Sequence, residues 1–172
     1  AVAASARGMM LHIEPLNLTD NPGYFLIGQA MAHSIVEEAG MDNVGVQFDL
    51  YHAQMSEGFI ADKVERFLAK SAYVQFAGVP GRHEPDDGEM NYEFLFGMLE
   101  DAGYDGWVGA EYRPRGETLA GLGWAKKYEI LLTDLTRLAT PLLPSGKGLL
   151  SEVPPSSRWP FSVPSSLASQ RL

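Results

Sequence analysis

The 172-residue sequence contains no cysteine, no long apolar run and no basic cluster. Without cysteine the chain has no disulfide, no thiolate zinc site and no thiol nucleophile, and it is compatible with a reducing compartment. No apolar run approaches the roughly 18 residues of a membrane span, and no signal-peptide pattern opens the chain. We therefore expect a cytoplasmic protein with no membrane partner.

The charge of the chain is acidic, with a formal net charge of -9 and a pI near 4.8. Proteins that bind nucleic acids carry basic patches, because neutralising phosphates releases counterions. This chain has no such patch. We expect no nucleic-acid partner.

Residues 139–172 differ in composition from the rest of the chain. These 34 residues hold six of the eleven prolines and eight serines, without a sustained helical or strand period. Such a segment builds a core poorly. We predict a disordered tail or a non-native end, such as a frameshifted or vector-derived one, and we place the folded part in residues 1–138.

Short apolar runs in residues 1–138 alternate with segments of helical periodicity. Runs rich in β-branched and aromatic residues are typical of buried strands; they cover residues 9–15, 44–50, 72–78 and 106–112. Segments with a one-sided apolar pattern predict helices; they cover residues 22–40, 59–72 and 92–104. Strands alternating with helices at this spacing indicate βαβ units, and hence an α/β fold with a parallel sheet.

Each predicted strand carries one polar side chain at or near its C-terminal end: Glu14, Asp49, Gln75 and Glu111, separated by 35, 26 and 36 positions. In a β/α barrel the C-terminal ends of different strands converge on the catalytic mouth. Three carboxylates and one amide crowded there would repel one another, and a divalent cation relieves that repulsion. The pattern therefore predicts a metal site, although a single strand-end carboxylate is more often a solvated or capping residue.

The remaining polar residues of these segments have structural as well as functional interpretations. Gln75 is the most informative ligand candidate, because an amide inside an apolar strand needs hydrogen-bond partners. His52, three residues after Asp49, is either a satisfied loop histidine or a substrate contact. We expect His12 to be a packed core residue and His33, in the middle of a predicted helix, to be structural.

A distinctive loop, AGVPGRHEPDDGEMNYEFLF, follows the predicted strand that carries Gln75. Its Arg82 can bind a substrate carboxylate or hydroxyl over the mouth of the site. The alternative interpretation of this loop is a turn with solvated charges.

Four stretches, IEPLN, FDLYHAQ, VQFAGVPGRHEPDDGEMNY and GYDGWVGAEYRPRGETLAGLGW, closely resemble the hydroxypyruvate isomerase family of the xylose-isomerase-like barrels. The resemblance covers about residues 10–128. It implies that Glu14 and Glu111 are both metal ligands and the catalytic pair that transfers the proton. It also implies that Asp49 and Gln75 are the two further metal ligands and that His52 and Arg82 orient the substrate. One departure is Gly78, where the family commonly has an Asp.

The resemblance also implies a TIM (β/α)8-barrel, of which this chain supplies the last four βα units. A complete barrel needs roughly 200 to 250 residues, so we predict a C-terminal half-barrel from a processed or truncated chain. Its two sheet edges would be exposed. Inward-facing apolar residues around Val46 and Val74 would lack the opposite wall, which favours self-association.

The implied reaction interconverts hydroxypyruvate and tartronate semialdehyde, with a small hydroxy-oxo acid as substrate. Moving a proton between adjacent carbons through an enediolate needs an acid, a base and charge stabilisation. All-oxygen ligands favour Mg²⁺ or Mn²⁺ as the divalent cofactor. The alternatives are a 2-oxo-tetronate isomerase or sugar epimerase, a nuclease of the apurinic-site type, and a non-catalytic truncated remnant. The nuclease is disfavoured because it would have a His-rich multi-zinc mouth and a basic rim.

Overall fold

The computed structural model of the chain describes residues 1–128. By its contacts the chain divides into two compact units, residues 1–115 and residues 116–172. The predicted tail at 139–172 and the last ten residues of the predicted folded part lie outside the described residues. Within residues 1–128, no helix is both long enough and apolar enough to cross a membrane.

The first unit is built on a four-stranded sheet in the order β1-β2-β3-β4. All neighbouring strands are parallel. The strands are β1 (Leu11–Ile13), β2 (Val44–Asp49), β3 (Ser71–Phe76) and β4 (Trp107–Ala110). Each strand overlaps one of the predicted apolar runs, so the predicted parallel α/β arrangement is confirmed.

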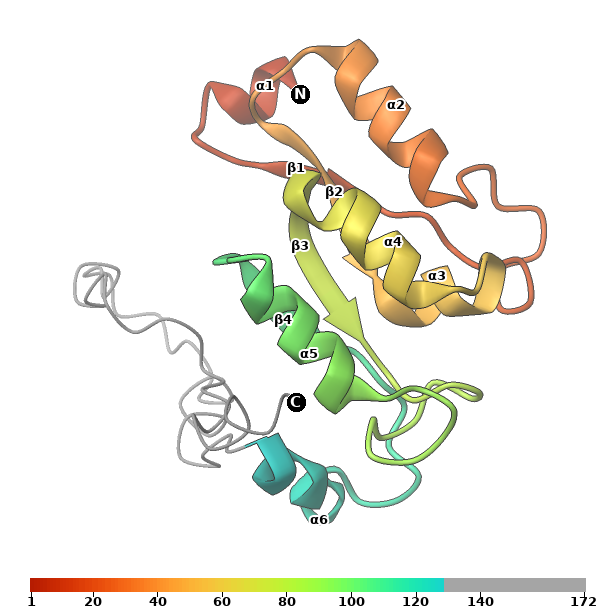
Figure 1. Cartoon of the computed structure of the whole chain (residues 1–172). Helices are drawn as coiled ribbons and strands as arrows, with labels where there is room; N and C mark the ends of the chain where they lie inside the picture. Colours follow the sequence, from red (N-terminus) through yellow and green to blue (C-terminus); the bar gives the residue numbers. More distant parts are fainter. Residues whose placement is uncertain (129–172) are drawn as a thin grey trace, which may run out of the picture. The chain divides into compact units, whose positions relative to one another are not determined.

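Helices connect successive strands, as parallel pairing requires. In the first unit these connections are α2 (Gln29–Ala39), then α3 (Leu50–Ser56), α4 (Ile60–Phe67) and the 3₁₀ turn η1 (Leu68–Lys70), and then α5 (Tyr92–Asp101), whereas α1 (Val2–Ser5) precedes β1. The second unit holds α6 (Thr118–Gly121) and the 3₁₀ segment η2 (Leu122–Tyr128). Figure 1 shows α2, α4 and α5 following one another across the same face of the sheet.

The helix predicted over residues 22–40 is shorter than expected. It begins at Gln29, because Gly28 has an extended backbone with φ -142° and ψ 149°. The preceding residues belong to the loop after β1, where the Leu16 N–H donates to the Leu26 carbonyl at 2.9 Å. The end of the helix is as predicted, with Gly40 in the left-handed conformation at φ 59°.

Helix α3 is a feature that the sequence patterns did not predict. It starts directly after β2, and Asp49 is its N-cap: the carboxylate Oδ1 accepts a hydrogen bond from the Tyr51 N–H at 2.8 Å. His52 therefore lies in the first turn of a helix and not in a loop. A helical turn fixes the direction of its side chains far better than a loop does.

The core of the first unit lies between the sheet and its helices. Val46, Phe48, Val74 and Phe76 are fully buried. The Phe76 ring packs on aromatic rings of α5, with centroid distances of 5.3 Å to Tyr92 and 5.1 Å to Phe96.

The expectation that Val46 and Val74 would be uncovered is therefore wrong. Side chains alternate between the two faces of a strand, and these valines face the helices. Their neighbours Gln47 and Gln75 occupy the opposite face, which corresponds to the inside of a barrel.

The opposite face of the sheet is polar and aromatic. His12 is exposed there and stacks on Tyr73 with a centroid distance of 6.2 Å. The prediction of a core histidine at position 12 is wrong, because α2, α4 and α5 cover only the other face. His33, in contrast, is buried on α2 and stacks on Phe67 at 4.9 Å.

Candidate active site

The four polar side chains at the predicted strand ends lie along one edge of the sheet. Glu14 directly follows β1, Asp49 is the last residue of β2, Gln75 is next to last in β3 and Glu111 directly follows β4. The Glu111 N–H donates to the Phe76 carbonyl at 3.1 Å, which extends the pairing of β3 and β4 to this edge. Because neighbouring strands are parallel, their carboxyl ends bring the four residues together.

Asp49 is the most deeply buried carboxylate of the site, with 1% of its surface exposed. Burial raises its pKa to about 7, and the Arg82 guanidinium opposes that shift. The Arg82 Nη2 atom lies 3.1 Å from Asp49 Oδ2. The neighbouring Glu14 charge raises the same pKa further. A buried carboxylate with one cationic partner is thus held near the point of protonation at neutral pH.

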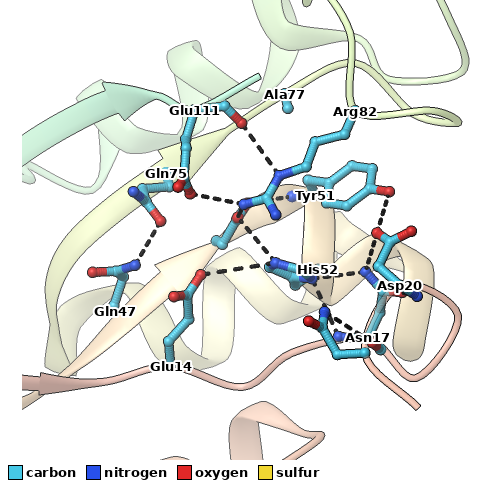
Figure 2. Close-up of polar contacts among 12 residues, drawn as sticks. Glu14, Asn17, Asp20, Gln47, Tyr51, His52, Gln75, Ala77, Arg82 and Glu111 are labelled. Atoms are coloured by element: carbon cyan, nitrogen blue, oxygen red, sulfur yellow. Dashed lines mark hydrogen bonds and ion pairs between the residues drawn. The ribbon is translucent and has the colours of Figure 1, made fainter. Parts of the chain in front are cut away.

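Arg82 bridges the acidic groups of the site (Figure 2). The Nη2 atom that contacts Asp49 also lies 2.7 Å from Glu111 Oε2, and Nε donates to the Glu111 carbonyl at 3.3 Å. The guanidinium carbon lies 5.2 Å from the centre of the Tyr51 ring, a cation–π contact. The single positive charge of Arg82 is thus shared between the side chains of Asp49 and Glu111.

The loop after β3 presents Arg82 through its own backbone hydrogen bonds. The Gly78 N–H donates to the His83 carbonyl at 2.8 Å, and the Arg113 N–H donates to the Arg82 carbonyl at 2.6 Å. A Cβ atom at Gly78 would lie only 2.5 Å from the Glu84 carbonyl oxygen. The path of this loop therefore requires glycine at position 78, where the hydroxypyruvate isomerase family commonly has Asp.

His52 is almost fully buried and faces the carboxylates with one ring nitrogen. Its Nε2 atom lies 3.7 Å from Asp49 Oδ2 and 4.0 Å from Glu14 Oε1. The other nitrogen, Nδ1, is contacted by Asn17 (Figure 2). Burial lowers the pKa of His52 to about 4, and the Arg82 charge acts in the same direction. The imidazole is thus neutral at physiological pH.

Glu14 and Gln75 are linked through Gln47 on the polar face of the sheet. The Gln47 amide donates to Gln75 Oε1 at 2.6 Å, which supplies a hydrogen-bond partner for the half-buried amide of Gln75. Burial raises the pKa of Glu14, and a hydrogen bond from Gln47 opposes that shift. One oxygen of Glu14, Oε1, is buried without a hydrogen-bond partner among residues 1–128.

These groups fit a hard divalent cation. Glu14, Asp49 and His52 each offer a potential ligand atom, and the three atoms lie within 4.8 Å of one another. Both carboxylates have raised pKa values because burial disfavours their charge, and a bound cation would offset that effect. In the present arrangement Gln75 bonds to Gln47 and Glu111 to Arg82.

Several residues of the site were missed by the sequence patterns. Asn17 and Asp20, from the loop after β1, and Tyr51 of α3 form a network around His52 in which the Tyr51 hydroxyl donates to Asp20 Oδ2 at 2.6 Å. Burial raises the pKa of Tyr51 to about 12. Gln47 did have a signal: the letters VQF occur in both β2 and β3, with a glutamine in the middle each time.

Comparisons with known proteins agree with this parallel α/β architecture. Residues 1–128 match the model of a family described as xylose isomerase-like TIM barrel. The chain is 53% identical over 128 residues to a 2-oxo-tetronate isomerase from Cupriavidus necator, covering 74% of this chain and 49% of that protein. It is 40% identical over 120 residues to a hydroxypyruvate isomerase from Escherichia coli, covering 70% and 46%.

Solved structures give the same picture. A structure named as an AP endonuclease, family 2, from Brucella melitensis matches with a TM-score of 0.69 and 47% identity, covering 72% of this chain and 48% of that one. A 3-keto-D-glucoside 4-epimerase from E. coli matches with a TM-score of 0.64 and 25% identity, covering 73% and 49%.

Fold and site together define an α/β protein of the barrel class with an acidic site at the carboxyl ends of its strands. The chain belongs to the xylose isomerase-like TIM barrel family. It spans about half the length of the curated relatives that it matches. That its strands correspond to the last four of such a barrel stays a prediction.

Proposed function

We propose that this site isomerises a short hydroxy-oxo acid, interconverting hydroxypyruvate and tartronate semialdehyde by proton transfer between adjacent carbons. The observation that carries the proposal is the placement of Glu14 and Glu111 at the ends of the two outer strands, with Asp49 and Arg82 between them. Two glutamates on either side of a substrate can remove a proton from one carbon and return it to the next. The names of the relatives support the same reaction class.

The residues of the site supply the other requirements of this chemistry. The raised pKa of Glu14 brings its carboxyl closer to the range in which it can both accept and donate a proton at neutral pH. Arg82 presents a planar guanidinium that can hold a substrate carboxylate. In doing so it would exchange its contacts with Asp49 and Glu111 for contacts with the substrate.

A divalent cation, Mg²⁺ or Mn²⁺, would be held by Glu14, Asp49, Gln75 and Glu111. When bound, it would polarise the substrate carbonyl and stabilise negative charge on the reacting oxygens. The buried Asp49 and the partnerless oxygen of Glu14 support this assignment.

A second candidate substrate is 2-oxo-tetronate, a four-carbon acid that the same residues could process. The identity to a 2-oxo-tetronate isomerase is 53%, against 40% to a hydroxypyruvate isomerase, and this difference supports 2-oxo-tetronate as a candidate substrate. The similarity to a sugar epimerase, at 25% identity, supports a sugar substrate less strongly. A nuclease has less support from the site, because among residues 1–128 His52 is the one histidine grouped with the acidic residues.

The test is product formation by the purified chain with Mg²⁺ or Mn²⁺ and each acid in turn, followed by NMR. We expect turnover of one of the two acids and a loss of at least 100-fold in Glu111→Gln, because the amide keeps the shape of the side chain but cannot take up a proton. Glu100→Gln, the same change at an exposed position on α5, is the matched control and should keep full activity.

Two outcomes of that test contradict the proposal. If Glu111→Gln retains most of the rate, Glu111 has no role in proton transfer. If the unmodified chain turns over neither acid with either metal, the interpretation as a non-catalytic remnant is favoured.

A further inference from the structure

Asn17 is a buried residue of the loop after β1, and its contacts point to a specific role. None of its surface is exposed, and it lies three positions after Glu14. Both its backbone N–H and its side-chain amide approach the Nδ1 atom of His52, at 3.2 and 2.7 Å. No role for Asn17 follows from the strand-end pattern that identifies the ligand candidates.

The orientation of the Asn17 amide is determined by Asp20. The Asp20 N–H can only donate, and it lies 2.9 Å from Asn17 Oδ1, so this atom is the amide oxygen. The amide nitrogen, Nδ2, therefore faces the other way, toward Asp20 Oδ2 at 3.0 Å and His52 Nδ1 at 2.7 Å. Asp20 is itself held by the Tyr51 hydroxyl.

Two N–H groups thus point at the same nitrogen of His52. A ring nitrogen that accepts hydrogen bonds carries no proton, and in a neutral imidazole the proton is then on the other nitrogen. The network therefore assigns the proton of His52 to Nε2. That atom faces the carboxylate edge and is buried without a hydrogen-bond partner among residues 1–128.

The unpartnered Nε2–H lies 4.0 Å from the unpartnered Glu14 Oε1. An oxygen atom placed at about 2.8 Å from each can accept from His52 and, if it is a hydroxyl, donate to Glu14. While Nε2 carries the proton it has no lone pair for a cation, so in this tautomer the potential ligand atom of His52 is blocked.

We propose that Asn17 is a positioning residue that holds His52 as the Nε2–H tautomer, so that His52 donates to a substrate oxygen and leaves metal ligation to the oxygen atoms of the site. The identity of that substrate rests on the proposed function, whereas the tautomer does not. Asn17 acts through His52 and needs no contact of its own with substrate.

The experiment is NMR of the full chain labelled with ¹⁵N, in which two-bond couplings of the histidine ring distinguish the two tautomers. The His52 signals are assigned by their absence in His52→Gln, and the spectra are recorded at neutral pH. We expect a single Nε2–H tautomer that persists when Mg²⁺ is added. A protonated Nδ1, or loss of the Nε2 proton on addition of Mg²⁺, overturns the assignment.

The role of the Asn17 side chain is tested by Asn17→Ala against Asn21→Ala. Asn21 lies in the same loop, and its side-chain amide donates to the Asn17 carbonyl rather than to His52. We expect Asn17→Ala to give a mixture of tautomers and Asn21→Ala to keep the original one. An unchanged tautomer in Asn17→Ala overturns the role of the side chain.

If Asn17→Ala does not fold, Asn17→Asp carries the same test, because it keeps the acceptor for the Asp20 N–H but has no side-chain donor. None of these spectra requires turnover. A chain that is inactive but retains the Nε2–H tautomer would contradict the proposed reaction and leave the assignment of Asn17 intact.

Discussion

Replacing Asp49 with Asn should stabilise the chain in the absence of a cation, and the gain should depend on pH. Burial raises the pKa of Asp49 from 3.8 to about 7. Because the folded state holds the proton more tightly than the unfolded state does, the carboxyl destabilises the fold as pH rises from about 4 to about 7. Each pKa unit corresponds to about 1.4 kcal/mol, so ionised Asp49 costs about 4 kcal/mol above pH 7.

The asparagine removes that ionisation but introduces a smaller cost. Its amide nitrogen would face the Arg82 guanidinium, and an unsatisfied buried donor costs about 1–3 kcal/mol. We therefore expect a net gain of roughly 2 kcal/mol at pH 8. The change of this gain with pH is a more specific test than the gain at one pH, because the cost of the unsatisfied amide donor is the same at every pH. The advantage of Asp49→Asn should grow by about 3 kcal/mol between pH 5 and pH 8.

The assay is urea unfolding of both proteins in EDTA at pH 5 and pH 8, with Asp42→Asn as the control at an exposed position. Added Mg²⁺ should stabilise the unmodified chain more than Asp49→Asn, because a ligand that binds only the folded state shifts the equilibrium toward it. An advantage that is independent of pH, or a variant less stable than the unmodified chain at pH 8, would refute the reasoning about buried charge.

Two further predictions concern the core and a buried histidine. Phe76→Ala should lose about 3–5 kcal/mol of unfolding free energy, because Phe76 is fully buried against α5. Phe94→Ala, at a position that is 55% exposed on the same helix, should lose less than about 1 kcal/mol; equal losses in urea unfolding would contradict the packing described. Burial lowers the pKa of His33, so the unfolded state binds its proton first and stability should fall as pH drops below about 6.5. His33→Leu should show a smaller loss of stability between pH 7 and pH 5, and an identical pH profile would show that His33 does not contribute.

The sheet was predictable because each strand is a short apolar run that ends on a polar residue. The same regularity located Glu14, Asp49, Gln75 and Glu111 at one edge, since parallel strands in sequential order bring like ends together. The start of α2 was not predictable from periodicity. Residues 22–28 are apolar enough to continue the helix, but Gly28 is extended and the Leu26 carbonyl accepts a hydrogen bond from the Leu16 N–H within the loop after β1.

The two faces of the strands were harder to assign. Periodicity alone leaves open whether the side of Val46 and Val74 faces helices or the inside of a barrel, and the packing of the helices decides it. The two-residue period does place Gln47 and Asp49 on the same side of β2, and a side that carries polar residues is the one that the helices leave uncovered. Helix α3 was missed because Asp49 serves both as strand end and as N-cap.

Contacts between side chains that are far apart in the sequence could not be predicted from the sequence patterns. Arg82 lies 33 positions from Asp49 and 29 from Glu111, yet it contacts both. Asn17 likewise contacts a histidine 35 positions away. The resemblance to a family could assign a role to Arg82, but the pairing of Asn17 with one nitrogen of His52 required coordinates.

The most direct test of the proposed isomerase site is exchange of substrate carbon-bound hydrogen with solvent in D₂O, measured by ¹H NMR on the purified chain. Proton transfer through a glutamate that exchanges with water would introduce deuterium at the reacting carbon. We predict incorporation into hydroxypyruvate or 2-oxo-tetronate that requires Mg²⁺ or Mn²⁺, stops in EDTA and is lost in Glu111→Gln. Incorporation that is equally fast in Glu111→Gln, or none above the rate of the protein-free solution with either metal, would contradict the assignment of this edge as an isomerase site.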